Sequence, residues 1–148
     1  MKPRLARGVT LAELVTVLVV LAVLTAIAVP VWQTHALRVR RTNAIEALST
    51  LQAAEDVFFG RHARYADARQ LALPVPDGLG LQDHSTQGHY HIELKASDDG
   101  LGYLATARPL SNTAQSADTR CTEFSIDHNG RRKAIDSDGA DRSADCWQ

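Results

Sequence analysis

The first sixty residues carry a hydrophobic pattern that changes character about half-way along. From Leu14 to Trp32, a run of 19 residues, no side chain is charged. At a rise of 1.5 Å per residue such a helix is about 28 Å long, close to the ~30 Å hydrocarbon core of a bilayer. The pattern therefore predicts a membrane-spanning helix. Pro30 is expected to kink it, because proline removes one backbone donor and clashes with the preceding turn.

Beyond this run, the apolar residues fall on one side of a continuing helix. They recur at steps of three, four or seven, at Leu37, Ala44, Ile45, Leu48, Leu51, Ala54 and Phe58. Most charged residues, among them Glu46, Glu55 and Asp56, are predicted to lie off this stripe. The spacing predicts an amphipathic helix that ends near Gly60 and packs against a folded domain.

After a loop rich in proline and glycine, the period of the pattern changes to two. Segments 89–95, 102–108 and 122–127 alternate and predict strands, with these side chains inward: Tyr90, Ile92, Leu94, Phe124 and Ile126. Asn129-Gly130 predicts a tight hairpin turn with positive φ at both residues, followed by a fourth strand over 132–135 and an irregular acidic tail. The fold class is therefore α+β, a long helix packed on a four-stranded antiparallel sheet.

Composition limits the classes of function. The 148 residues leave room for one modest domain beyond the apolar helix. The formal net charge of −1 argues against a general nucleic-acid binder, although local basic patches stay open. The sequence contains none of the hydrolase, zinc-protease, P-loop or dinucleotide motifs, so we expect no catalysis and no cofactor.

One acidic residue, Glu13, lies just inside the apolar run, where a carboxylate needs an interfacial position or a partner. With the basic leader before it and the apolar helix after it, this segment resembles the prepilin signature of type IV pilins: Gly8-Val9-Thr10-Leu11-Ala12-Glu13-Leu14. The resemblance implies cleavage by a prepilin peptidase between Gly8 and Val9, N-methylation of Val9 and a role for Glu13 in subunit assembly. Val9 departs from the Phe or Met that the family most often has there, and Pro30 falls where pilins commonly carry a helix-bending proline.

Elementary electrostatics is consistent with this interpretation. A new ammonium group at Val9 would be expensive in a membrane or filament core unless the Glu13 of a neighbouring subunit neutralised it. Two alternatives stay open. Glu13 could lie among the headgroups without a specific partner. Ala26-Ile27-Ala28 also has the form of an ordinary signal-peptidase site, and cleavage there would leave a chain that starts at Val29.

The two cysteines, Cys121 and Cys146, lie in the part of the chain that would be exported. An oxidising compartment favours a disulfide between them, and free thiols are the alternative. The C-terminal pattern resembles that of PilE-like minor pilins, a family that includes ComP-like DNA-uptake receptors: Cys121-Thr-Glu-Phe-Ser-Ile-Asp-His-Asn-Gly-Arg-Arg-Lys133, then Cys146-Trp147. The resemblance implies a type IV pilin fold with a disulfide-bounded C-terminal region.

Three basic residues follow the predicted turn and are candidates for contacts with DNA phosphates: Arg131, Arg132 and Lys133. The alternative is an ordinary solvated hairpin, because three acids are close in sequence: Asp127, Asp136 and Asp138.

We predict no metal site. An acidic run superficially suggests calcium, at Asp136, Asp138, Gly139, Asp141 and Asp145. Its glycine comes too early for an EF-hand loop, however, and the bidentate Glu of such a loop is absent. His89 and His91 would share the outer face of one strand without a third ligand, and we expect them to be solvated.

These observations predict five parts: a prepilin leader (1–8), a transmembrane and filament-core half-helix (9–32), an amphipathic half-helix (33–60), a connecting loop (61–88), and a sheet with its disulfide loop (89–148). The resemblance implies a minor pilin of the type IV pilus that serves pilus assembly, with roles in twitching motility, adhesion and DNA uptake. The alternatives are a ComP-like DNA-binding pilin of the competence machinery and a type II secretion pseudopilin.

The same resemblance implies partners and a location. The partners are other pilin subunits, the prepilin peptidase and methyltransferase, the inner-membrane assembly machinery and DNA. The chain would be a single-pass protein of the bacterial inner membrane with a periplasmic C-terminal domain, and later part of a cell-surface pilus.

Overall fold

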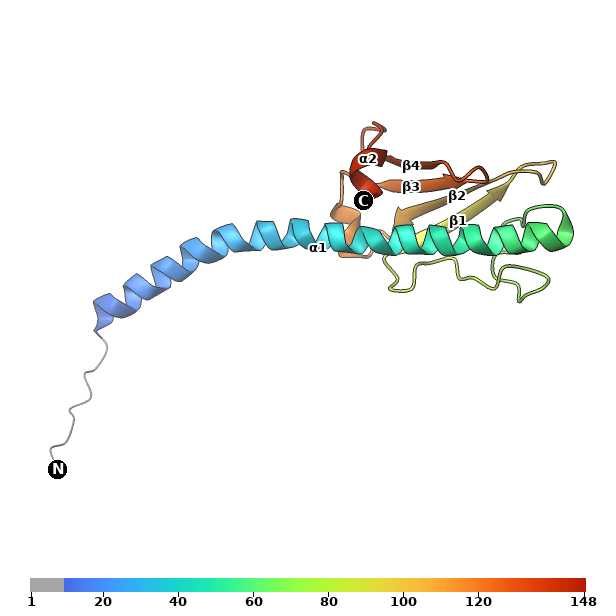
Figure 1. Ribbon diagram of the computed structural model, residues 1–148. Helices are drawn as coiled ribbons and strands as arrows, with labels where there is room; N and C mark the ends of the chain where they lie inside the picture. Colours follow the sequence, from blue (N-terminus) through green and yellow to red (C-terminus); the bar gives the residue numbers. More distant parts are fainter. Residues whose placement is uncertain (1–9) are drawn as a thin grey trace, which may run out of the picture. The chain divides into compact units, whose positions relative to one another are not determined.

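The structure, a computed structural model, describes residues 10–148 (Figure 1). The predicted leader, with Gly8, and the predicted mature N-terminus Val9 therefore lie outside the described residues. The chain divides between Ala36 and Leu37 into two compact units. One helix, α1 (Leu11–His62), contributes residues to both.

The first unit is the apolar part of α1. Its side chains are exposed from Leu11 to His35, and within residues 10–148 only α1 is long and apolar enough to cross a membrane. The hydroxyl groups of Thr16, Thr25 and Thr34 donate to carbonyl groups of the preceding turn, so these polar groups are satisfied inside the helix, as an apolar surrounding requires. The helix continues through Pro30 without interruption, and the kink there stays a prediction.

The second unit contains a four-stranded antiparallel sheet in the order β1-β2-β3-β4 (Figure 1). Its strands are β1 (Tyr90–Ala96), β2 (Tyr103–Pro109), β3 (Glu123–Asp127) and β4 (Arg132–Ile135). In the register of the sheet, Leu94 pairs with Ala105, Ala107 with Phe124, and Phe124 with Ala134. The predicted meander is confirmed, and Pro109 ends β2 as its last residue rather than lying beyond it.

The core forms where one face of the sheet meets the second half of α1. The predicted inward side chains of β1 and β3 are all buried, and they join one cluster with Ala44, Leu48, Leu51 and Phe58 of α1. Burial of each large apolar side chain stabilises the fold by about 1.5–3 kcal/mol. The α+β fold class predicted from the two periodicities is therefore confirmed.

The end of α1 differs from the prediction. The helix does not stop at Gly60 but continues to His62. Ala63 then adopts a left-handed conformation with φ of 54°, and its N–H donates to the carbonyl of Phe59 at 2.8 Å. This is the left-handed cap that usually uses glycine. Here an alanine occupies the strained position and the glycine lies inside the helix.

Glu55 was predicted to lie off the apolar stripe, and this was wrong. Its side chain is fully buried, because the buried positions of α1 follow steps of four and three that include residue 55. Oε2 accepts the N–H of Ala66 at 2.9 Å, whereas Oε1 has no hydrogen-bond partner among the described residues. Burial raises the pKa of Glu55 to about 7; the bond from Ala66 opposes this rise, and the nearby Asp56 carboxylate adds to it.

The hairpin between β3 and β4 also differs in detail. Only Gly130 has positive φ, at 73°, whereas Asn129 does not. The N–H of Asp127 donates to the carbonyl of Arg131 at 3.2 Å, so three residues rather than two close the turn. Asp127 Oδ1 accepts the N–H groups of Asn129 and Arg131, both at 2.9 Å, which stabilises this longer loop.

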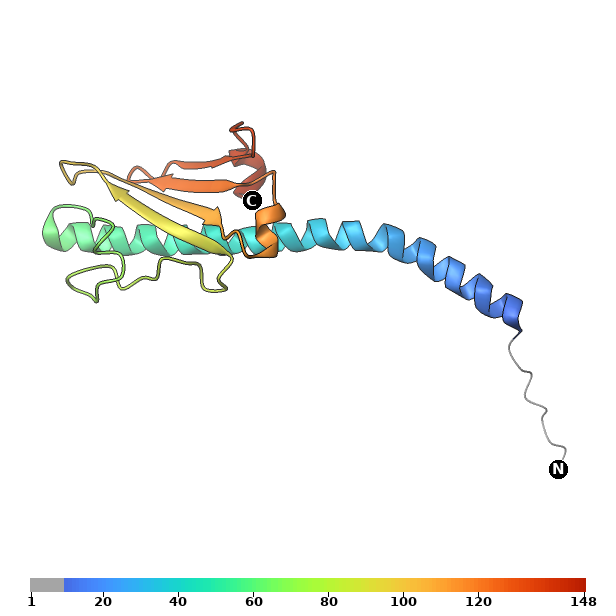
Figure 2. The same ribbon diagram turned by 180° about the vertical axis from the view of Figure 1, so that it is seen from behind.

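Two short helical segments were not predicted. A 3-10 helix, η1 (Ala114–Ala117), precedes the first cysteine, and one helical turn, α2 (Ser143–Cys146), interrupts the tail that was expected to be irregular (Figure 2). The Ser143 hydroxyl accepts the N–H of Ala134 in β4 at 2.9 Å. The tail is thereby fixed to the sheet edge rather than extending freely.

Candidate functional site

Glu13 has a partner within its own helix. The N–H of Glu13 donates to the hydroxyl of Thr10 at 3.3 Å, and the N–H of Thr10 lies 3.5 Å from the Glu13 carboxylate. This reciprocal pair is a capping box at the start of α1. The sequence signal, Thr followed three residues later by Glu, was present but not used. The assembly role of Glu13 stays a prediction.

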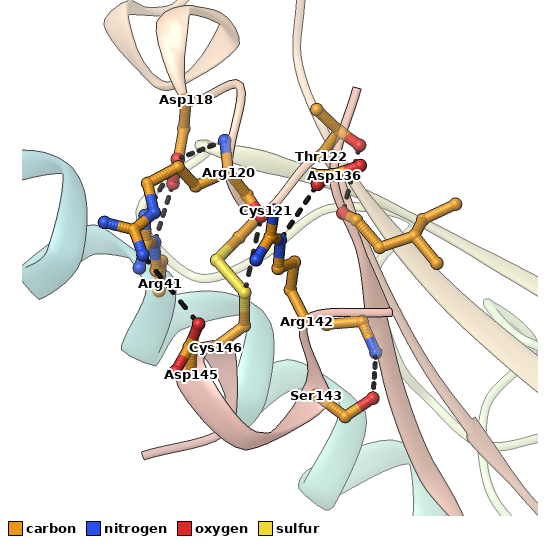
Figure 3. The surroundings of a disulfide bond; sticks show 12 residues. Arg41, Asp118, Arg120, Cys121, Thr122, Asp136, Arg142, Ser143, Asp145 and Cys146 are labelled. Atoms are coloured by element: carbon orange, nitrogen blue, oxygen red, sulfur yellow. Dashed lines mark hydrogen bonds and ion pairs between the residues drawn. A yellow bond between two sulfur atoms is a disulfide. The ribbon is translucent and has the colours of Figure 1, made fainter. Parts of the chain in front are cut away.

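The disulfide between Cys121 and Cys146 is confirmed (Figure 3). Its Cα atoms are 6.0 Å apart, and both cysteines are buried. The bridge joins the last residue of α2 to the segment that leads into β3. It therefore fixes the C-terminal tail beside the sheet.

An ion pair that the sequence did not predict lies beside the disulfide (Figure 3). Arg41 of α1 donates two hydrogen bonds to Asp118, from Nε at 2.7 Å and from a terminal nitrogen at 2.8 Å. The Gln115 amide of η1 adds a bond to the same carboxylate at 3.0 Å. These contacts attach η1 and the following segment to α1.

The three basic residues of the predicted DNA site lie together at the β3–β4 hairpin. Arg131, Arg132 and Lys133 are exposed, and in residues 10–148 none of them forms a salt bridge. The Arg132 guanidinium lies over the ring of Trp147, 5.2 Å from its centroid, which positions this side chain without neutralising it.

The acids expected to neutralise the hairpin have other partners. Asp127 accepts the backbone N–H groups of the turn, as described above. Asp136 pairs with Arg142 at 2.9 Å, and this bond holds the pKa of Asp136 below its ordinary value. The Asp136 carboxylate therefore stays ionised and bonded to Arg142. Neither acid forms a salt bridge with the hairpin cations among residues 10–148. Hydrogen bonds within its own turn hold the pKa of Asp141 below its ordinary value, and the charge of nearby Lys133 adds to this effect.

The outer face of the sheet does not offer a comparable basic patch. Arg108 bonds to Glu123 at 2.7 Å and to Glu93 at 2.9 Å, and Lys95 pairs with the same Glu93 at 2.9 Å. On this face the two acids Glu93 and Glu123 thus balance the two bases Arg108 and Lys95.

The acidic tail does not gather its carboxylates. Asp136 and Asp141 accept backbone N–H groups of their own turns, and Asp145 lies 3.8 Å from Arg120. Within the described part of the chain, no group of three or more potential ligands is arranged to hold a metal ion.

Comparisons with known proteins complete this picture. A model of the family described as "Type IV minor pilin ComP, DNA uptake sequence receptor" matches residues 30–125, which end before the basic hairpin. A solved type IV pilin from Shewanella oneidensis is 23% identical with a TM-score of 0.47, and the match covers 65% of this chain and 89% of that one. No curated protein sequence matches significantly. Because the family match spans well over half of the chain, and the helix, sheet and disulfide are in place, the protein belongs to the ComP family of type IV minor pilins.

Proposed function

We propose that this minor pilin binds DNA during uptake, and that the β3–β4 hairpin supplies the phosphate contacts. The observation that carries the proposal is the set of three exposed cations that form no salt bridge within the described residues 10–148, on a chain whose family is described as a DNA uptake sequence receptor. Adjacent cations at the start of one strand and beside its turn create a local positive potential even on a chain with negative net charge.

The geometry gives the three side chains different tasks. Neighbouring residues of a strand point to opposite faces, so Arg132 and Lys133 of β4 would not contact the same phosphate group. Arg132 is held over Trp147, whereas Arg131 lies directly between the turn and β4. We expect Arg131 and Lys133 to make flexible phosphate contacts, and Arg132 to present a fixed guanidinium.

The N-terminal part supports assembly into the filament. The apolar segment of α1 would hold the precursor in the inner membrane with its C-terminal domain in the periplasm. A prepilin peptidase would cleave between Gly8 and Val9, and Glu13 would pair with the methylated ammonium of a neighbouring subunit. Glu13 would then exchange its capping contact with Thr10 for a stronger charge pair in a low-dielectric filament core.

The mass of the intact protein from its own membranes tests this processing. We expect a chain that begins at Val9 and carries one added methyl group and one disulfide, so that reduction adds two hydrogens. A chain that begins at Val29 would instead mean that the apolar segment is a discarded signal peptide. Assembly through α1 would then be excluded.

DNA binding is tested with the full chain in detergent micelles and a fluorescently labelled duplex, by anisotropy at several salt concentrations. The triple charge reversal R131E/R132E/K133E should abolish binding. Neutralising one phosphate contact with R131A should reduce the slope of log affinity against log salt by about 0.9. The control is R69E, because Arg69 is a similarly exposed cation whose partner is the local Asp67.

Two further measurements separate charge from packing. Because Arg132 packs on Trp147, the double variant R131E/K133E removes charge without disturbing that contact. Unchanged DNA binding in both multiple variants would refute the hairpin site. In cells, a hairpin variant that still assembles pili should lose DNA uptake while twitching motility and adhesion persist.

A further inference from the structure

His84 and His91 face each other at the free edge of β1. They form an isolated antiparallel bridge, flanked by the bond from the Ser85 N–H to the Tyr90 carbonyl at 2.8 Å and the bond from the Ile92 N–H to the Asp83 carbonyl at 2.7 Å. These two bonds lie on either side of the histidines, which therefore form a non-hydrogen-bonded pair. Side chains of such a pair lie on the same face with Cβ atoms about 4.5–5.5 Å apart.

The neighbouring carboxylate determines which nitrogen of His84 is available. His84 Nδ1 lies 3.0 Å from Asp83 Oδ1, so Nδ1 carries the proton and donates it. In the neutral imidazole, Nε2 is then the nitrogen that offers a lone pair, on the side of the ring away from Nδ1. The same carboxylate–histidine arrangement fixes the tautomer and orientation of histidines that bind metal ions.

Both imidazole rings are accessible. The side chain of His84 is 45% exposed, His91 is exposed, and among residues 10–148 no hydrogen bond occupies the ring of His91. The Asp83 carboxylate adds one negative charge beside the pair, which offsets part of the charge of a cation bound there.

We propose that His84 and His91 together bind a divalent transition-metal ion that prefers imidazole, such as Zn²⁺ or Cu²⁺. Metal–nitrogen bonds of about 2.0–2.1 Å at a tetrahedral ion place the two nitrogens about 3.3 Å apart, which rotation of two cross-strand side chains can reach. Two imidazoles select such ions over Mg²⁺ and Ca²⁺, which prefer oxygen ligands.

The site has a structural consequence and open coordination positions. A bound ion would join the end of the connecting loop to β1 and would stabilise the folded domain, since the unfolded chain does not hold the two rings together. The remaining positions on the metal stay open to water or to a donor atom of a second molecule. The proposal does not depend on the DNA-binding hairpin.

The test uses the full chain in detergent micelles, purified without a polyhistidine tag and titrated with ZnCl₂ by calorimetry. We expect one Zn²⁺ per chain, with affinity at least tenfold lower in H84N and in H91N. D83N should weaken binding by about 10–100-fold, because the carboxylate orients the ligand. MgCl₂ should not compete.

The matched control is H128N, which makes the same substitution at another exposed histidine, on the β3–β4 hairpin. Its Zn²⁺ affinity should equal that of the unsubstituted chain, and the melting temperature of every variant without metal should be unchanged. The proposal is overturned if the unsubstituted chain shows no saturable Zn²⁺ binding, or if H84N and H91N bind as tightly as H128N. The DNA-binding variant R131E/K133E should retain Zn²⁺ binding, which separates the two proposals.

Discussion

Arg41 and Asp118, 77 residues apart in the sequence, form a bidentate ion pair that is almost completely buried. The side chain of Asp118 is 2% exposed and that of Arg41 is 11% exposed. Because the Gln115 amide bonds to the same carboxylate and also to the carbonyl of Leu37 in α1, the contact joins α1 and η1 in two ways. It lies next to the disulfide, so the chain is fixed to α1 shortly before it enters β3.

We expect R41A to lower the free energy of unfolding by about 3–5 kcal/mol, because it leaves the buried Asp118 carboxylate without its cation. R41K should lie in between, since an ammonium retains the charge but not the planar pair of bonds. Chemical denaturation of the full chain in micelles measures both. The control R38A removes an exposed arginine of the same helix and should change stability by no more than about 0.5 kcal/mol. An equal effect of R41A and R38A would contradict the prediction.

The buried Glu55 makes stability depend on pH. Its pKa rises from an ordinary 4.5 to about 7 in the folded chain, so the folded state binds more protons than the unfolded state between these values. Its contribution is fully present below pH 4.5 and is lost as the pH rises to 7, by about 3 kcal/mol in total. Denaturation curves at several pH values measure the slope.

E55Q should flatten this dependence, because the uncharged amide can still accept the Ala66 N–H bond. The comparison with the unsubstituted chain removes the contribution of histidines that titrate in the same range. D56N serves as the matched control at the next residue, which is exposed, and should leave most of the slope in place. If E55Q and the unsubstituted chain showed the same slope, Glu55 would not be the group responsible.

Two separate substitutions at the end of α1 should each stabilise the protein. G60A places a better helix former inside the helix, where a Cβ atom meets no neighbour, and should add about 0.5–1 kcal/mol. A63G relieves an alanine held at φ of 54° and should add about 1 kcal/mol. The double variant should show the sum. Loss of stability in A63G would mean that the left-handed cap is not formed in solution.

Removal of the disulfide should lower the free energy of unfolding by about 3–4 kcal/mol, given the separation of 25 residues between its cysteines. The double variant C121S/C146S tests this, and reductant should then have no effect on it. Fluorescence of Trp147 should report the loss of the disulfide locally. This residue directly follows Cys146, and the centroid of its ring lies 5.9 Å from that of Phe124. Equal stability of the oxidised and reduced forms would contradict this expectation.

Local patterns were sufficient for α1 and the four strands of the fold. Tyr90, Ile92 and Leu94 alternate with polar residues and are buried on one face of β1, as the period of two predicts. The apolar run up to Trp32 and the apolar stripe after it likewise predicted that α1 is apolar all round in its first half and amphipathic in its second half. These features depend only on residues a few positions apart, so the sequence shows them directly.

The contacts that join distant segments depended on the tertiary structure. No local pattern indicates that Arg41 meets Asp118, and the assignment of Glu55 to the polar side followed its chemical type rather than its position in the buried row. His89 and His91 were expected to share the outer face of one strand as solvated side chains, and no sequence pattern indicated that His91 lies opposite His84. The sequence by itself determined α1 with its apolar segment, the four strands and the inward faces of β1 and β3, because local periodicity specifies these. Only tertiary packing decided which charged and ligating side chains meet. These residues are far apart in the sequence, and no spacing along the chain indicates that they lie close together in the fold.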